Sequence, residues 1–132
     1  MKIVPLGSEE QAIEKANTIM RAYHNVRKEY PDFSVKVFVC GLKLKFLDMS
    51  LNDIIMNNAK AIYDNVKDED ENFMVGIDFV NEEDESRNFS EFEKYVVEAK
   101  EKMPEIYFTP HAGESLKLDD SNLRYAIEQN VP

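Results

Sequence analysis

The sequence predicts an α/β fold in which helices connect the strands of a parallel sheet. Segments with helical periodicity alternate with short apolar segments along the chain, which is the order expected of crossover connections. The apolar segments are nearly continuous, as in strands that are buried on both faces. The chain has 132 residues and no internal repeat, so we expect one domain over residues 1–132.

Four helices are expected from the spacing of apolar residues. The first covers residues 8–29, with Ser8 as the N-cap and Gln11 three residues later, as in a capping box. The same periodicity is found in three further segments: residues 50–66, 89–103 and 119–130. Asp119 or Asp120 is the expected cap of the last helix.

Three strands are expected between these helices. They are rich in β-branched and aromatic residues and cover residues 34–42, 73–80 and 105–111. Gly41 is expected to end the first strand. The acidic segment 67–72 and the polar segment 81–88 are expected to be solvated loops.

The composition excludes several classes of partner. The formal net charge is -10, which argues against a nucleic-acid polymer or an anionic membrane as a partner but not against a small neutral substrate. No apolar run is long enough to cross a membrane, and the first residues lack the layout of a signal peptide. The single cysteine, Cys40, excludes an internal disulfide and a multi-cysteine metal site.

Polar side chains follow the second and third predicted strands, at the edge of a parallel sheet where active sites form. After the third strand, His111 is able to ligate a metal through a ring nitrogen. Gly113 would let a substrate approach the backbone, and Glu114 has the position of a general acid or base beside a metal-bound water. The alternative is a strand-end histidine bonded to the backbone and a solvated glutamate, because a lone H-x-x-E motif is weak.

The remaining candidates have simpler interpretations. Asp78 lies inside an apolar strand and must be hydrogen-bonded or paired, either to hold neighbouring strand ends or to reach a ligand. Residues 82–84 are expected to be solvated, although they lie on the same face. His24 is expected at a helix surface or helix contact, and Cys40 is expected to be a buried, inert thiol.

Two motifs in this order resemble the adenosine deaminase family. V-G-I-D-F-V-N-E-E-D covers residues 75–84, and H-A-G-E covers residues 111–114 about thirty residues later. The closest branch is the adenosine deaminase-related growth factors, whose first motif is similar to G-F-D-L-V-G-x-E-D. The resemblance extends back to residues 34–43, which are similar to the third barrel strand, and forward to residues 119–132, so it covers nearly the whole chain.

The resemblance implies a partial (β/α)₈ TIM barrel, with strands three to five of the family, and a zinc ion at its C-terminal mouth. The family reaction hydrolyses the 6-amino group of adenosine or 2'-deoxyadenosine, giving inosine or deoxyinosine and ammonia. By position, His111 would be a zinc ligand and Glu114 would protonate the purine nitrogen N1. Asn81 would meet the base through its backbone, with Gly113 and Asp78 as the other substrate-side residues, Asp78 in support of the strand end.

The chain also departs from the family pattern. Asn81 stands where the family has glycine, although asparagine tolerates left-handed backbone conformations. Leu42 and Lys43 stand where branch members often have a histidine that lines the pocket. The family's other zinc ligands, an H-x-H and an aspartate, and a further histidine that assists the reaction have no counterpart in the chain. A catalytic zinc site needs three protein ligands, so we expect a central segment that is inactive alone.

Two other interpretations remain open. The chain is either part of a deaminase or a truncated, non-catalytic relative that acts as a binding protein and self-associates through exposed barrel edges. A small open domain of flavodoxin-like type is the third interpretation, against which the missing glycine-rich phosphate loop weighs. The compartment is extracellular for the growth-factor-like branch and cytoplasmic otherwise.

Overall fold

The computed structural model describes residues 1–116 and 121–130 and has an α/β architecture. Its main sheet has the strand order β1-β2-β5-β6, and every neighbouring pair is parallel. The strands are β1 (Lys2–Ile3), β2 (Val37–Leu42), β5 (Met74–Val80) and β6 (Tyr107–Phe108). The helices are α1 (Glu9–Arg27), α2 (Ser50–Asn65), α3 (Glu93–Lys102) and α4 (Ser121–Asn130), with a 3-10 turn, η1 (Phe89–Phe92), before α3.

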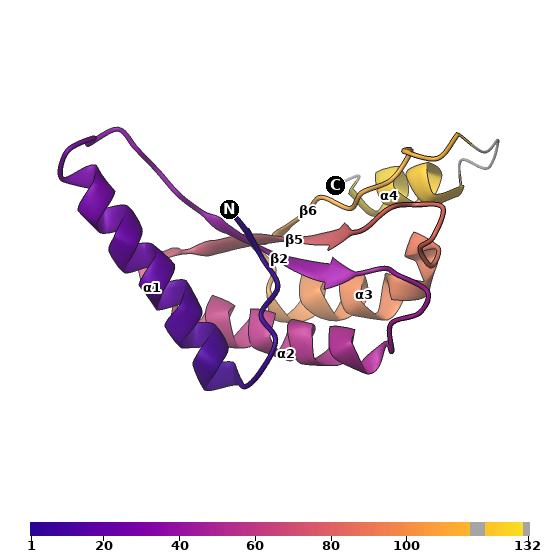
Figure 1. The fold of residues 1–132 in the computed structure, drawn as a ribbon, viewed down its shortest axis with the longest axis horizontal. Helices are drawn as coiled ribbons and strands as arrows, with labels where there is room; N and C mark the ends of the chain where they lie inside the picture. Colours follow the sequence, from indigo (N-terminus) through magenta and orange to yellow (C-terminus); the bar gives the residue numbers. More distant parts are fainter. Residues whose placement is uncertain (117–120, 131–132) are drawn as a thin grey trace.

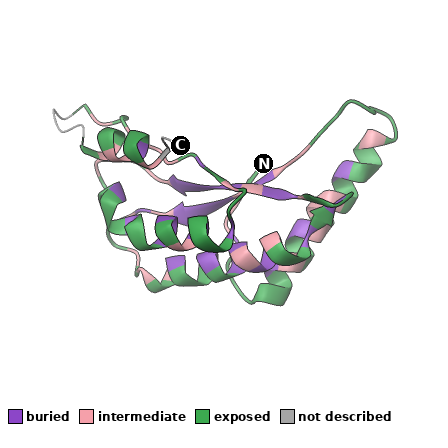
Figure 2. Ribbon diagram, turned by 180° about the vertical axis from the view of Figure 1, so that it is seen from behind, coloured by how far each residue is buried: buried purple, intermediate pink, exposed green. Residues whose placement is uncertain are grey.

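The sheet is built in sequence order, each new strand lying beside the one before it. One helix lies between each pair of successive strands, and α1, α2 and α3 all lie on the same side of the sheet (Figures 1 and 2). This is the result of right-handed crossovers that all wind in one direction. Within the described residues the sheet is open, with β1 and β6 at its edges, and it does not close into a barrel.

The sheet has four strands, not the three expected. The additional strand, β1, pairs Lys2 with Phe38 and Ile3 with Val39. It was missed because a strand of two residues shows no periodicity. The α1 capping box is confirmed: Ser8 Oγ accepts from the Gln11 N–H at 3.2 Å, and Gln11 Oε1 accepts from the Ser8 N–H at 3.0 Å. The expected α4 cap, Asp119 or Asp120, lies outside the described residues.

Two expectations for the loops were wrong. Gly41 lies inside β2 and does not end it. A Cβ atom there would lie 2.7 Å from the Phe79 ring, so glycine is needed for close packing and not for a turn. The acidic segment 67–72 forms a hairpin of β3 (Lys67–Asp68) and β4 (Glu71–Asn72). Glu69 and Asp70 make its turn with φ of 52° and 74°, as in the tight turns that suit right-twisted strands.

An aromatic cluster anchors β5 on the helix side of the sheet. Phe79 packs against Phe89, Phe92 and Tyr95 with ring centroids 5.1 to 6.5 Å apart, and all four side chains are buried. Successive residues of a strand point to opposite faces, so Asp78 points to the side without these helices. In the described part of the chain, no helix is long and apolar enough to span a membrane.

Candidate functional site

The residues that follow β6 remain paired with β5. The Thr109 N–H donates to Ile77 O at 3.0 Å, and the His111 N–H donates to Phe79 O at 3.0 Å. These bonds continue the parallel pairing beyond the two residues assigned to β6. They bring His111 beside the end of β5, so the expected meeting of the two motifs at one sheet edge is observed.

His111 and Asp78 form a hydrogen-bonded pair. His111 Nδ1 lies 2.9 Å from Asp78 Oδ1, and the Asp78 side chain is fully buried while that of His111 is 34% exposed. A carboxylate only accepts, so Nδ1 carries the proton of the neutral ring and Nε2 keeps its lone pair. Among the described residues, only Nδ1 of this ring has a hydrogen-bond partner.

Asp78 is also paired with a cation from the edge of the sheet. Lys2 Nζ, from β1, lies 2.5 Å from Asp78 Oδ2. The buried carboxylate therefore links β1, β5 and the residue that follows β6. The expectation that Asp78 must be paired is confirmed, and of its two expected roles the structure shows the one that holds strand ends together.

Lys43, directly after β2, is fully buried; from the sequence it was expected beside the pocket but without a role there. Its Nζ donates to His111 O at 2.5 Å. Burial lowers the pKa of Lys43, while the charges of Glu83, Glu114 and Asp78 oppose this shift. The sequence showed a lysine directly after an apolar strand, at the position of the family's pocket-lining histidine, but not its bond to His111.

Glu83 is buried at 8% exposure and is not the solvated loop residue expected. Its carboxylate accepts from the backbone N–H groups of Gly113 at 3.2 Å, Glu114 at 2.6 Å and Ser115 at 2.7 Å. Asn122 Nδ2 donates to the same carboxylate at 3.1 Å. Burial opposes ionisation, but these hydrogen bonds together hold the pKa of Glu83 below its usual value.

Two predicted substrate-side residues have backbone conformations that favour glycine. Asn81 has a φ of 107° and Gly113 a φ of 80°. Asn81 Oδ1 also accepts from the Lys43 N–H at 3.1 Å. Asn81 therefore has a backbone conformation typical of glycine. Glu114 is exposed.

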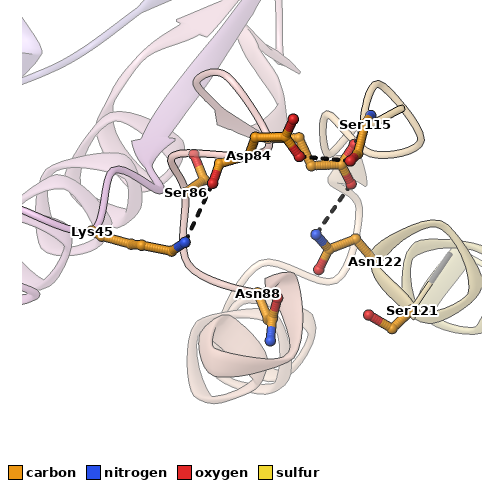
Figure 3. A pocket seen from close by; sticks show the side chains of 8 residues that line it. Lys45, Asp84, Ser86, Asn88, Ser115, Ser121 and Asn122 are labelled. Atoms are coloured by element: carbon orange, nitrogen blue, oxygen red, sulfur yellow. Dashed lines mark hydrogen bonds between the residues drawn. The ribbon is translucent and has the colours of Figure 1, made fainter. Parts of the chain in front are cut away.

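A polar pocket lies beside these residues (Figure 3). Its volume is about 110 Å³. Side chains of the loop after β5 and of the start of α4 contribute to it: it is lined by Lys45, Glu83, Asp84, Ser86, Asn88, Ser115, Ser121 and Asn122. Neither His111, the predicted zinc ligand, nor Glu114, the predicted acid, lines this pocket.

The described residues do not form a zinc site by themselves. No group of three His, Cys, Asp or Glu side chains that could hold a metal is found among residues 1–116 and 121–130, and zinc sites use at least three protein ligands. The second histidine, His24, pairs with Asp68 at 2.8 Å, whereas His111 pairs with Asp78. Cys40 is buried, and burial raises the pKa of its thiol, as expected of an inert residue.

Comparison with known proteins gives no relative: the chain matches no family model, no curated protein and no solved structure. The adenosine deaminase resemblance thus rests on the two sequence motifs. The pairing of His111 with Asp78 is a separate observation, made in the structure.

Proposed function

We propose that the chain is a segment of a zinc-dependent adenosine deaminase. It would supply His111 as one zinc ligand and Glu114 as the acid that protonates purine N1. The observation that carries this proposal is the His111–Asp78 pair, with 2.9 Å between Nδ1 and Oδ1. Metal-binding histidines usually donate their other ring N–H to a carboxylate or a carbonyl, which fixes the tautomer and the ring orientation.

The arrangement of the sheet supports a partial (β/α)₈ barrel. Four parallel strands in sequence order, with successive helices on one side, are the arrangement of consecutive strands in such a barrel. In a barrel the helix-free face is the interior, and catalytic residues lie at the C-terminal strand ends. Asp78 points to the helix-free face and His111 follows the last strand, as this interpretation requires.

The glycine-like backbone at Asn81 supports the purine-binding role. A positive φ is a backbone conformation that most residues other than glycine disfavour, because their Cβ atom clashes with the backbone. Asn81 takes it up with φ of 107°. The backbone contact to the base that the family makes through glycine is therefore compatible with asparagine at this position.

The same proposal includes an incomplete metal site. Since the described residues offer no group of three ligands, the other zinc ligands would come from segments outside them. The chain alone would then convert no adenosine. Its own contribution to the complete site would be His111, Glu114 and the backbone at Asn81.

A nucleoside titration followed by NMR tests the proposal. Adenosine is added to the ¹⁵N-labelled chain, and uridine serves as a matched nucleoside without a purine ring. We expect adenosine to shift the amide signals of residues 78–83 and 111–115, with no inosine formed. Equal shifts with uridine, or no shifts at these residues, would contradict the deaminase proposal.

A non-catalytic binding protein is the second candidate, favoured by one observation. An apolar groove of about 240 Å³ lies along α1, and it is lined by Met1, Ile19, Ala22, Tyr23, Val26, Phe33 and Val35. Exposed apolar grooves often mark interaction surfaces. Sedimentation of the chain over a range of concentrations tests self-association, and Val26→Glu should abolish it if the groove is the contact.

A further inference from the structure

Residues 111–115 receive little support from the sheet itself. The strand before them, β6, has two residues, and the last backbone bond to β5 is that of the His111 N–H to Phe79 O. Beyond that bond, the described partners of the N–H groups of Gly113, Glu114 and Ser115 are side-chain oxygens. The segment that carries both predicted catalytic groups is therefore held by side chains of other elements.

On one side, Glu83 binds three successive N–H groups. Its two carboxylate oxygens accept at 2.6 to 3.2 Å from residues 113–115. Hydrogen bonds to a carboxylate are roughly twice as strong as neutral ones. A single buried anion therefore defines the backbone conformation on both sides of Glu114.

On the other side, Lys43 binds the carbonyl group of His111. The ammonium is fully buried and donates to His111 O at 2.5 Å. Lys43 is itself fixed by its backbone N–H, which donates to Val80 O and to Asn81 Oδ1, each at 3.1 Å. Buried charges are retained only where they are paired or hydrogen-bonded, and this one is bonded to the backbone of the site.

We propose that Glu83 and Lys43 are positioning residues that together clamp residues 111–115 and so orient His111 and Glu114. What His111 and Glu114 do rests on the proposed function, whereas the clamp itself does not. The two residues come from the ends of different strands, β5 and β2, so the clamp ties the segment to both. We name Glu83 and Lys43 the clamp pair.

The clamp pair is tested by NMR without zinc or nucleoside. The matched variants are Glu83→Gln with Glu82→Gln as control, and Lys43→Met with Lys45→Met as control. In Glu83→Gln we expect amide hydrogen exchange at residues 113–115 to accelerate about tenfold or more, with Val39 and Ile77 unchanged. In Lys43→Met the carbonyl of His111 loses its donor, so we expect the ring to leave its position against Asp78. Its ¹⁵N signals at about pH 8 should then change from those of the Nδ1–H tautomer to an average of the two tautomers.

The controls should leave both readouts as in the unsubstituted chain. Unchanged exchange at residues 113–115 in a folded Glu83→Gln chain would overturn the proposal. Where a variant does not fold, the test is made on the unsubstituted chain. Scalar couplings from the Glu114 and Ser115 amides to the Glu83 carboxyl carbon, transmitted through the hydrogen bonds, must be observed. Their absence overturns the clamp. An intact clamp in a chain that binds no adenosine would instead overturn only the proposed function.

Discussion

At the scale of the residue, three buried ionisable side chains surround the start of the 111–115 segment. Asp78 and Lys43 are fully buried and Glu83 is 8% exposed. Each has a charged or hydrogen-bonded partner: Lys2 and His111 for Asp78, the His111 carbonyl for Lys43, and backbone N–H groups for Glu83. Burying a charged or polar group costs free energy unless the group is paired or hydrogen-bonded. Removing any one of the three side chains would therefore leave its partners buried and unpaired, which should destabilise the fold.

Replacing Asp78 tests its hold on His111. In Asp78→Asn the side chain keeps its size but loses the charge that selects the Nδ1–H tautomer. We expect the ¹⁵N signals of the His111 ring to become tautomer-averaged and the free energy of unfolding to fall by about 1–3 kcal/mol. Ring ¹⁵N spectra and urea denaturation measure the two effects. Asp68→Asn is the control and should alter His24 only; an unchanged His111 ring in Asp78→Asn would contradict the assigned pair.

Replacing Asn81 separates backbone strain from hydrogen bonding. Asn81 has a φ of 107°, which alanine tolerates poorly and glycine tolerates well. We expect Asn81→Ala to lower the free energy of unfolding by about 2 kcal/mol. Asn81→Gly should change it by less than about 1 kcal/mol, because the Lys43 N–H keeps its bond to Val80 O. Chemical denaturation of the two variants checks this order, and the reverse order would contradict it.

Acid should weaken the contribution of Glu83. Its folded-state pKa lies below the ordinary value of 4.5, so its stabilising contribution is present above that value and is lost as the pH falls through the folded-state pKa. Glu83→Gln should therefore be less stable than the unsubstituted chain at neutral pH, and the difference should shrink on acidification. Urea denaturation at a series of pH values measures it; a difference that stays constant would show that Glu83 is not ionised in the folded state.

The site was predictable from sequence only in part, for reasons of residue chemistry. His111, Gly113 and Asp78 could be named as candidates from the sequence, because each is unusual at its position: a histidine and a glycine after a strand, and a carboxylate inside one. Glu83 was not, since it lies in a run of acidic residues whose members look alike. Lys43 was not, because its role depends on the distance to His111 O, which no local pattern encodes.

At the scale of the element, long elements were predicted more closely than the shortest ones. The helix expected at 50–66 is observed as α2 (Ser50–Asn65), since its apolar residues repeat over several turns. The strand expected at 105–111 is assigned only at Tyr107–Phe108, although its pairing with β5 continues to His111. The β3–β4 hairpin was missed because its charged sequence lacks the apolar residues by which strands are recognised.

The start of α1 offers a test of an element that the sequence predicted. Ser8 and Gln11 satisfy each other's backbone N–H groups, so Ser8→Ala leaves the N–H of Gln11 without its acceptor. We expect a loss of about 1 kcal/mol in the free energy of unfolding, measured by chemical denaturation. Ser34→Ala, at an exposed serine outside any helix, is the control. An equal loss in both variants would show that the cap is not the cause.

At the scale of the whole molecule, the two faces of the sheet differ in what they carry. The aromatic cluster around Phe79 attaches the sheet to η1 and α3, while Asp78 points to the other side and binds Lys2 and His111. Because successive strand residues point to opposite faces, Phe79 packs in the core while Asp78 faces the residues of the proposed site. The α/β class and the parallel sheet followed from the sequence, and among the described residues this sheet is open, with β1 and β6 at its edges.

The proposed role of His111 as a metal ligand is tested by a zinc titration followed by the ring ¹⁵N signals of both histidines. We expect zinc to shift the Nε2 signal of His111, Asp78→Asn to reduce this shift, and no adenosine to be converted. An Nε2 signal that does not respond to a large excess of zinc would contradict the ligand assignment. Turnover of adenosine by this chain alone would contradict the claim that its site is incomplete.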